Sequence, residues 1–245
     1  MVDFSKVKGI IFDYGGTIDS RGDHWSEIIW QGYRQAEIAV DKVTFRDAYV
    51  YAERRLARER HIMPCDDFRR LMSVKIQLEL QYLADQGHDV SGRCGSMAQA
   101  VTDIAAYCDD YARTCVDEAK PTLEALHSRY PMVLVSNFYG NIDAVLSEFG
   151  IRHLFQGIIE SSVVGVRKPD PRIFTLGTVA LGLAPADTLV VGDSLRKDIL
   201  PAESIGCQVA WIKGRGWTAD EDAATHPAQI ENIAKLAAAA LCNIN

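Results

Sequence analysis

Carboxylates stand directly after two short apolar runs of this sequence. Asp13 follows the run 9–12, and Asp193 follows closely on the run 188–191, with Asp198 five residues further on. Carboxylates that gather in one place cannot all ionise cheaply unless a cation lies among them. A hard divalent ion such as Mg²⁺ prefers oxygen ligands of this kind and keeps waters for a phosphate. If the fold brings the three side chains together, they can hold Mg²⁺ beside a phosphate.

Other polar groups occur in similar positions and suit the oxygens of a phosphoryl group. Ser136 and Asn137 follow a third apolar run, 132–135, and Lys168 lies in the loop sequence Val-Arg-Lys-Pro-Asp-Pro over 166–171. A lysine ammonium and a hydroxyl can both donate to a phosphoryl group during its transfer. We therefore expect these side chains to meet the carboxylates in one crevice.

The elements that must position these groups are predicted from the hydrophobic pattern. Short apolar strands are predicted at 9–12, 132–135, 157–160, 188–191 and 208–212. From residue 121 onward, helical patterns lie between the strands, and this alternation is typical of a parallel sheet covered on both faces. Ligands of such sheets bind beyond the carboxyl ends of the strands, which is where the polar groups stand.

Residues 24–116 interrupt the alternation with a block that is predicted to be helical throughout. Apolar residues recur in it at helical spacing. Thr44–Asp47 has the pattern of a capping box that opens one of these helices. Pro121 is predicted to begin the next helix, where the alternating pattern returns. The sequence therefore predicts an α/β protein with a helical insertion after its first strand.

Four segments, taken in order, resemble the motifs of the haloacid dehalogenase (HAD) superfamily. They are Phe12–Thr17, Val135–Asn137, Lys168–Pro171 and Val191–Asp198. Four motifs in order, at strand ends or on matching loops, make the resemblance specific, and it covers the whole chain. The insert between the first two motifs matches the helical cap of subclass I members. The resemblance implies a Rossmann-like parallel sheet core at 1–20 and 117–245 with an inserted α-helical cap domain at 21–116.

The resemblance also implies a role for each matching residue. Asp13 matches the nucleophile, which forms an aspartyl-phosphate. Ser136 matches the hydroxyl that holds the phosphoryl group, and Lys168 matches the cation that steadies nucleophile and phosphate. Asn137 and Thr17 match motif residues beside the phosphate.

A magnesium site is implied in the same way, so the expected cofactor is Mg²⁺. Its expected ligands are the carboxylates of Asp13 and Asp193 and the backbone carbonyl of Gly15. Asp198 matches either a second acidic ligand of the metal or a carboxylate that supports the ligands without contacting the metal. It could also cap the helix that follows.

Gly15 is the main departure from the family pattern. Phosphatases of the family carry an aspartate at this position, which protonates the leaving group and later activates water. General acid–base catalysis of this kind typically contributes about 10²- to 10⁴-fold to a rate. Asp19 and His24 lie shortly downstream and are the residues that could supply the proton instead.

The resemblance favours a Mg²⁺-dependent phosphatase of a small phosphorylated metabolite. A phosphonatase and a dehalogenase of the same fold remain as alternatives, and so does a binding or regulatory protein with weakened turnover. Dehalogenases of the family have a tyrosine two residues after the nucleophile, whereas Tyr14 stands one position early. Phosphonatases use a cap lysine as a Schiff base. The cap region holds only Lys42 and Lys75, and the surrounding sequence does not indicate that either lysine is buried or activated.

Composition sets the expected partners and location. The chain has 245 residues and a formal net charge of −7, which argues against a nucleic-acid partner. It contains no apolar run of membrane-spanning length, and its beginning has no signal-peptide pattern. The expectation is a cytoplasmic protein whose partner is a small phosphorylated molecule, with no nucleic acid and no membrane; the sequence does not predict an oligomeric state. The six cysteines are expected to be reduced and mostly buried.

An arginine-rich stretch of the insert leaves two interpretations open. Residues 54–70 contain six arginines against three acidic residues. They form either a patch for an anionic substrate or a solvated helix face with ion pairs along the helix.

Overall fold

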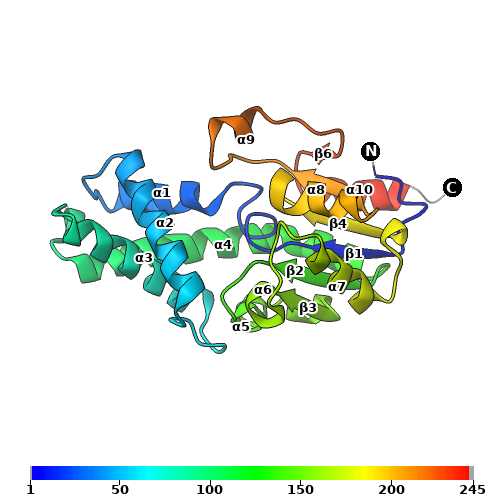
Figure 1. Ribbon diagram of the computed structural model, residues 1–245, viewed down its shortest axis with the longest axis horizontal. Helices are drawn as coiled ribbons and strands as arrows, with labels where there is room; N and C mark the ends of the chain where they lie inside the picture. Colours follow the sequence, from blue (N-terminus) through cyan, green and yellow to red (C-terminus); the bar gives the residue numbers. More distant parts are fainter. Residues whose placement is uncertain (1, 243–245) are drawn as a thin grey trace.

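The computed structural model describes residues 2–242 and contains a six-stranded sheet (Figure 1). The strand order is β3-β2-β1-β4-β5-β6, and every pairing is parallel. The strands are β1 (Gly9–Phe12), β2 (Met132–Ser136), β3 (Gly157–Glu160), β4 (Thr188–Gly192), β5 (Gln208–Ile212) and β6 (Gln229–Ile230). The carboxyl ends of β2, β1 and β4 therefore lie side by side at one edge, and the predicted α/β class is confirmed.

Helices cover both faces of the sheet. Alternate residues of each strand point to opposite sides, and the residues on both sides are apolar, so each face needs a cover. Ile10 and Phe12 of β1 pack in one buried cluster, while Ile11 between them packs in the other. The first cluster is shared with α5 (Ile142–Glu148) and α10 (Ala234–Cys242), and the second with α7 (Arg172–Leu181) and α8 (Leu200–Ser204). Two shorter helices are α6 (Ser161–Val164) and α9 (Ala219–Ala223). Short helical turns occur at Gly92–Cys94, Arg152–Leu154, Pro185–Asp187 and Leu195–Ile199.

The helical insertion between β1 and β2 confirms the predicted cap. It consists of α1 (Trp25–Gln35), α2 (Lys42–Arg58), α3 (Phe68–Asp85) and α4 (Met97–His127). In Figure 1 these helices extend to the left of the sheet, beyond the carboxyl ends of its strands. Their buried apolar residues continue into the cluster that covers one face of the sheet. The cap is therefore packed onto the core and stands over the strand ends that carry the polar groups.

The start of α2 differs from the prediction. The helix begins at Lys42, and the carboxylate of Asp41 caps it by accepting a hydrogen bond from the Thr44 backbone N–H at 2.7 Å. The capping box predicted at Thr44–Asp47 is therefore wrong. Asp41 occupies the extended backbone conformation that an N-cap needs, so the helix starts one turn earlier than the pattern suggested.

The prediction that Pro121 begins a helix is wrong, because this residue lies inside α4. This helix runs without a break for 31 residues. Its apolar face continues on both sides of the proline through Val116, Ala119 and Leu123, which are all buried. The missing N–H of Pro121 therefore lies on the exposed face of a helix that packing holds together. We keep the boundary at 116/117 as a proposal, although α4 crosses it.

Two further properties bear on the predictions. Among the helices of residues 2–242, none is long and apolar enough to cross a membrane. Cys108, Cys115 and Cys207 are buried free thiols, and Cys65 is an exposed one. The side chains of Cys94 and Cys242 lie outside what the structure describes.

We expect Pro121→Ala to stabilise the protein. The change restores the backbone hydrogen bond to the carbonyl of residue 117, which proline cannot make inside a helix. Part of this gain is offset because proline also restricts the unfolded chain. The free energy of unfolding, measured by urea titration, should rise by about 1–2 kcal/mol. Glu124→Ala, at another exposed position of α4, serves as the control and should change it by less than about 0.5 kcal/mol. A loss of stability in Pro121→Ala would show that the helix is bent to suit the proline.

Candidate active site

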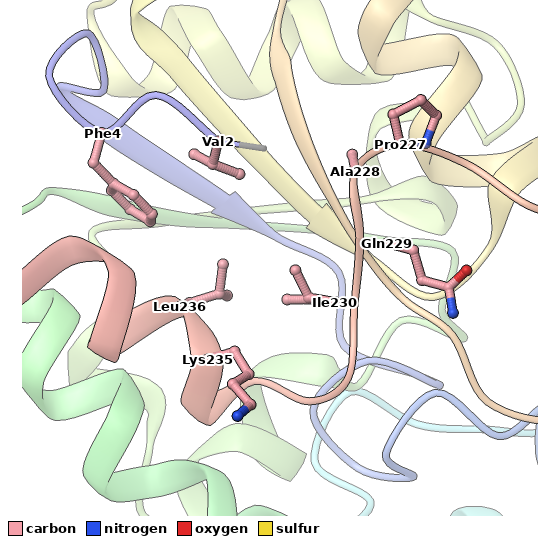
Figure 2. A pocket seen from close by; sticks show the side chains of 8 residues that line it. All are labelled: Val2, Phe4, Pro227, Ala228, Gln229, Ile230, Lys235 and Leu236. Carbon is pink, nitrogen blue, oxygen red and sulfur yellow. The ribbon is translucent and has the colours of Figure 1, made fainter. Parts of the chain in front are cut away.

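A cavity of about 880 Å³ opens between the carboxyl edge of the sheet and the cap helices. Its core side is formed mainly by residues that follow β1, β2, β4 and β5, and its cap side by residues of α1, α2 and α3. The predicted site residues that line it are Asp13, Gly15, Ser136, Asn137, Lys168, Asp193 and Asp198. A second hollow, of about 210 Å³, lies between the N-terminal segment and α10 (Figure 2). Its lining is mostly apolar, so it lacks the groups for this chemistry.

The carboxylate of Asp13 is held by three side chains from different parts of the chain. The Lys168 ammonium donates to its Oδ1 at 2.6 Å and the Ser136 hydroxyl donates to the same oxygen at 3.1 Å. The Thr17 hydroxyl lies 3.2 Å from Oδ2. Asp13 itself is only 5% exposed. Strand β1 therefore ends in a carboxylate whose orientation is fixed and whose surroundings supply donors.

Lys168 is the central cation of this arrangement. Its ammonium also lies 2.6 Å from Oδ1 of Asp198, and the side chain is 3% exposed. Burial alone would lower the pKa of Lys168, but the neighbouring carboxylates of Asp13 and Asp198 outweigh it, so the pKa is raised. The lysine is therefore charged at neutral pH.

The Asn137 side chain holds the lysine loop in place. Its Oδ1 accepts a hydrogen bond from the Lys168 backbone N–H at 2.9 Å, and its Nδ2 donates to the Lys168 carbonyl at 3.1 Å. Both ends of the amide are thus engaged with the backbone of the lysine. The sequence suggested a place beside the phosphate, and in the structure this side chain positions Lys168.

Three carboxylates come together as the sequence predicted. Ligand oxygens of Asp13, Asp193 and Asp198 all lie within 4.8 Å of one another. Burial raises the pKa of Asp193 well above its ordinary value, and the charges of Asp198 and Asp13 raise it further. Burial also raises the pKa of Asp198, although Lys168 acts against this. One ammonium does not neutralise three carboxylates, and hard oxygen ligands of this charge fit a divalent cation.

Two glycines allow the carboxylates to approach so closely. A Cβ on Gly16 would lie 2.4 Å from the Asp193 carboxylate, and one on Gly192 would lie 2.4 Å from the Cβ of Asp198. Gly16 also has a φ of +99°, which glycine adopts readily. The loop after Gly192 is a short π-helical turn, Leu195–Ile199, and Asp198 accepts the Ser194 N–H at 3.0 Å within it. The side chain that caps this turn is Ser194, so Asp198 is not the N-cap.

Gly15 leaves open space where a side chain would project. The nearest atom to a Cβ built there is Cδ1 of Trp25, at 4.0 Å. Among the described residues, no carboxylate atom lies within 4 Å of this Cβ. The position at which the resemblance expects an acid is therefore open to the cavity.

Neither of the two downstream candidates fills this gap. Asp19 lines the cavity wall but has no exposed surface, and its two oxygens accept the Gly16 N–H at 2.7 Å and the Trp25 Nε1–H at 3.0 Å. Burial raises the pKa of Asp19 to about 8, but a fully covered carboxyl cannot contact a substrate. Burial lowers the pKa of His24 to about 3, so its imidazole is neutral and a poor proton donor.

Sequence reasoning missed the polar cluster on the cap side of the cavity. Lys75 was not marked as buried, yet its side chain is 4% exposed and pairs with Glu53. The signal was present: Lys75 and Glu79 fall on the apolar stripe of α3, where Leu71 and Ile76 are also buried. A charged residue inside an apolar stripe indicates a buried partner.

The six arginines of 54–70 do not line the cavity. Arg54, Arg58, Arg60, Arg69 and Arg70 are exposed. The structure therefore favours the interpretation of a solvated helix face.

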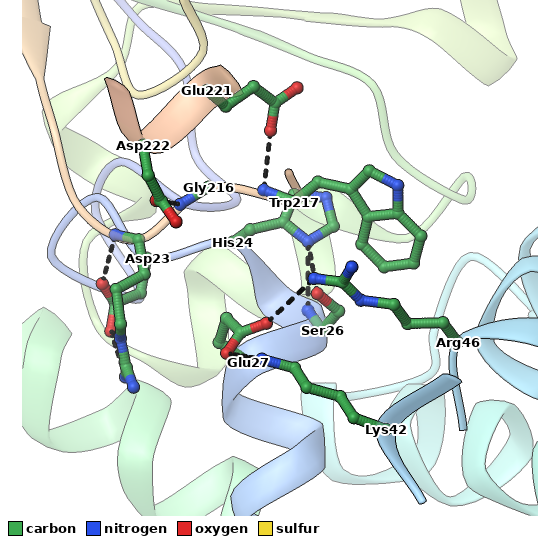
Figure 3. Close-up of polar contacts among 11 residues, drawn as sticks. Asp23, His24, Ser26, Glu27, Lys42, Arg46, Gly216, Trp217, Glu221 and Asp222 are labelled. Carbon is green, nitrogen blue, oxygen red and sulfur yellow. Dashed lines mark hydrogen bonds and ion pairs between the residues drawn. The ribbon is translucent and has the colours of Figure 1, made fainter. Parts of the chain in front are cut away.

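A segment from the core runs alongside the linker that leads into the cap (Figure 3). The His24 backbone N–H donates to the Arg215 carbonyl at 2.8 Å. The Arg215 guanidinium pairs with Asp23 at 2.5 Å. The chain that follows β5 is thus joined to the first connection between the core and the cap.

Trp217 continues this segment into the cavity wall. Its ring packs against His24 and Tyr49, with centroid distances of 5.3 Å and 5.4 Å, and the Arg46 guanidinium lies 4.6 Å from its centroid. Tyr49 and Arg46 belong to α2 of the cap. One side of the cavity is therefore built jointly by core and cap residues.

Comparison with known proteins adds a family and a fold. The sequence model of the haloacid dehalogenase-like hydrolases matches residues 7–206. A phosphoserine phosphatase of Thermus thermophilus is 38% identical over 63 residues, which are 26% of this chain and 25% of that protein. A phosphoglycolate phosphatase of Pasteurella multocida is 37% identical over 95 residues, 38% of this chain and 42% of that protein. The matched stretches therefore span between a quarter and a half of these curated relatives.

Solved structures agree on the fold. A HAD-hydrolase of Bacillus subtilis, YfnB, which was solved bound to magnesium, superposes with a TM-score of 0.59 at 16% identity. The superposition covers 97% of this chain and 99% of that one. At this identity the likeness establishes the shared fold, in which a capped parallel sheet presents its carboxyl edge to a cavity.

Proposed function

The chain belongs to the haloacid dehalogenase-like hydrolases, and we propose that it is a Mg²⁺-dependent phosphatase that acts on a small phosphorylated molecule through an aspartyl-phosphate. The observation that carries this proposal is the Asp13 carboxylate, oriented by Lys168, Ser136 and Thr17 at the floor of the cavity. The relatives that match part of this chain and are named as phosphatases of small metabolites support the same reaction class.

In this proposal Asp13 is the nucleophile. A carboxylate oxygen bonds to phosphorus, and the bond from phosphorus to the leaving oxygen breaks, with its electron pair going to that oxygen. Lys168 and the Ser136 hydroxyl offer donors for the phosphoryl oxygens as their charge shifts. Water then attacks the phosphorus of the aspartyl-phosphate and releases inorganic phosphate and free Asp13.

The proposed metal ligands are Asp13, Asp193, Asp198 and the carbonyl of Gly15. The three buried or half-buried carboxylates, compensated by a single lysine, fit a hard divalent cation. When bound, Mg²⁺ would offset the charge of the phosphoryl group. Other residues of the chain position the site. Asn137 holds Lys168, and the Thr17 hydroxyl lies between Asp13 and Asp193.

Gly15 determines which phosphates the site can cleave. A phenol has a pKa of about 10, so a phenolate leaves without prior protonation far more readily than an alkoxide does. Without an acid at position 15, the first step favours aryl or acyl phosphates. The second step lacks the base that would activate water. We therefore propose a weak phosphatase whose aspartyl-phosphate accumulates.

The alternatives receive less support. Tyr14 is buried against Phe138, with ring centroids 5.7 Å apart, and does not line the cavity as a dehalogenase tyrosine would need to. Lys75 does line the cavity, as a phosphonatase lysine would. Burial acts to lower its pKa, but Glu53 outweighs this and raises the pKa well above its ordinary value, so the amine is protonated and cannot attack a carbonyl. A binding protein without turnover would not need the ordered donors around Asp13.

Mg²⁺ binding should depend on Asp193. Titration calorimetry should show binding to the wild type and at least about tenfold weaker binding to Asp193→Asn, because the cation loses a charged ligand. Asp187→Asn removes a carboxylate that pairs with Lys8 away from the cavity and should bind Mg²⁺ like the wild type. Equal affinity in all three proteins would refute the assignment.

Gly15→Asp should raise turnover of alkyl phosphates by about 10²-fold, the lower end of general acid–base contributions, because a grafted side chain is not ideally held. The backbone at Gly15 is not left-handed, and a Cβ there has room. Steady-state turnover of one aryl and one alkyl phosphate by both proteins measures the effect.

The matched control is Gly15→Asn, which has the same shape but no acid and should not raise alkyl turnover. Wild-type turnover of alkyl phosphates as fast as that of aryl phosphates would contradict the role given to Gly15. It would mean that another group delivers the proton.

A further inference from the structure

The cap end of the cavity holds a carboxylate with one oxygen committed and one free. Oε1 of Glu53 accepts hydrogen bonds from the Lys75 ammonium and, at 2.7 Å, from the Tyr139 hydroxyl. Oε2 accepts none from the residues that the structure describes. Glu53 comes from α2, Lys75 from α3 and Tyr139 from the loop after β2. The contacts to Oε1 come from two other segments, and they fix the carboxylate and with it the direction of the free oxygen.

The Glu53 carboxylate is ionised and accessible. Burial acts to raise its pKa, but Lys75 and Tyr139 outweigh this, so the pKa lies below its ordinary value. The Glu53 side chain is 34% exposed and lines the same cavity as Asp13. An ionised oxygen without a donor is an acceptor ready for a ligand group.

Lys75 is not available to a ligand in the same way. Its side chain is 4% exposed, and its ammonium is bonded to Glu53 and lies 4.1 Å from the ring centroid of Tyr49. An anionic group of a ligand would have to displace Glu53 from it. The cluster therefore presents an acceptor to the cavity, and it selects for donors.

Part of the cavity wall is apolar and aromatic. The cavity walls include Trp25, Phe68, Leu71, Met72, Phe138 and Trp217. Trp25 and Phe68 pack together, with ring centroids 5.3 Å apart. Walls of this kind suit a flat, apolar body better than a fully hydrated one.

We propose that Glu53 is a specificity-determining residue, which accepts a hydrogen bond from a hydroxyl or ammonium group at the far end of an aryl phosphate. This inference rests on the proposed function, because it places the phosphoryl group at Asp13. The aromatic ring then lies among the apolar walls, and its substituent meets Oε2 of Glu53. The lack of an acid at Gly15 and the acceptor at Glu53 together select a phenolic leaving group that carries a hydrogen-bond donor.

The experiment compares para-substituted phenyl phosphates that differ in the group that would meet Glu53, and the same set assayed with Glu53→Gln corrects for the effect of each substituent on the acidity of the leaving phenol. The substituents are ethyl, hydroxymethyl, aminomethyl and carboxymethyl. A charge-assisted hydrogen bond should make kcat/KM of at least one donor-bearing substrate about tenfold or more higher than that of the ethyl compound. The carboxymethyl compound should be the poorest substrate. The hydroxymethyl and aminomethyl compounds distinguish the neutral donor from the cationic one.

Glu53→Gln should abolish the preference for donors over ethyl, because Lys75 and Tyr139 both donate and keep the amide oxygen on their side, so that the amide NH₂, which is a donor, takes the place of Oε2. Glu59→Gln, at the exposed C-terminal end of the same helix and outside the cavity, is the matched control and should keep the preference. If Glu53→Gln does not fold, because it leaves Lys75 without its charged partner, the double variant Glu53→Leu with Lys75→Met replaces the ion pair by an apolar one. It too should lose the preference.

The outcomes separate this inference from the function on which it rests. Equal kcat/KM for the ethyl and both donor-bearing compounds overturns the role of Glu53 and leaves the phosphatase standing. A preference that survives in Glu53→Gln or in the double variant overturns it as well. Absence of turnover with every aryl phosphate in the presence of Mg²⁺ overturns the proposed function and this inference together.

Discussion

The Lys168 ammonium lies between two buried carboxylates, 2.6 Å from Asp13 and 2.6 Å from Asp198. Burying charges is costly unless they are paired, so this contact is the condition on which the rest of the site depends. A third carboxylate, Asp193, forms no ion pair with the residues that the structure describes, and burial together with the charges of Asp198 and Asp13 raises its pKa. The imbalance is a structural reason to expect a divalent cation, and it is independent of any relative.

The same constraint explains which parts of the site tolerate no side chain. Gly16 and Gly192 are in contact with the carboxylates themselves, and a Cβ at either would collide with them. Gly15, between Asp13 and Gly16 in the chain, faces open space instead. Its lack of a side chain is therefore not demanded by packing. We interpret it as a chemical difference, which removes proton transfer while the groups for charge stabilisation are retained.

Much of the core could be predicted from the sequence because its information is local. The five apolar runs predicted to be strands all form strands of the sheet, and parallel strands bring their ends to one edge, so the meeting of Asp13, Asp193 and Asp198 followed from topology. The start of α2 was missed for a local reason, the cap that Asp41 provides, whereas two other features were decided by tertiary contacts. Pro121 is carried inside α4 by packing on both sides of it. The pairing of Glu53 with Lys75 joins two helices whose relative position no sequence pattern revealed.

The site also depends on segments that motifs do not mark. The loop after β2 supplies Tyr139 to the cap cluster, and the chain after β5 supplies Trp217 to the cavity wall. These contacts join core and cap around a single cavity. They are specific to the arrangement of the folded chain, and a list of motif residues does not contain them.

The most direct test of the account is the capture of the intermediate on Asp13. The wild type is mixed with an aryl phosphate and Mg²⁺, quenched in acid during turnover and analysed by peptide mass spectrometry. The account predicts that a large share of the enzyme carries a phosphoryl group on Asp13, because Gly15 leaves hydrolysis of this species slow, and that Asp13→Asn carries none. Turnover without any phosphoryl group on Asp13, or with the group on another residue, would contradict it.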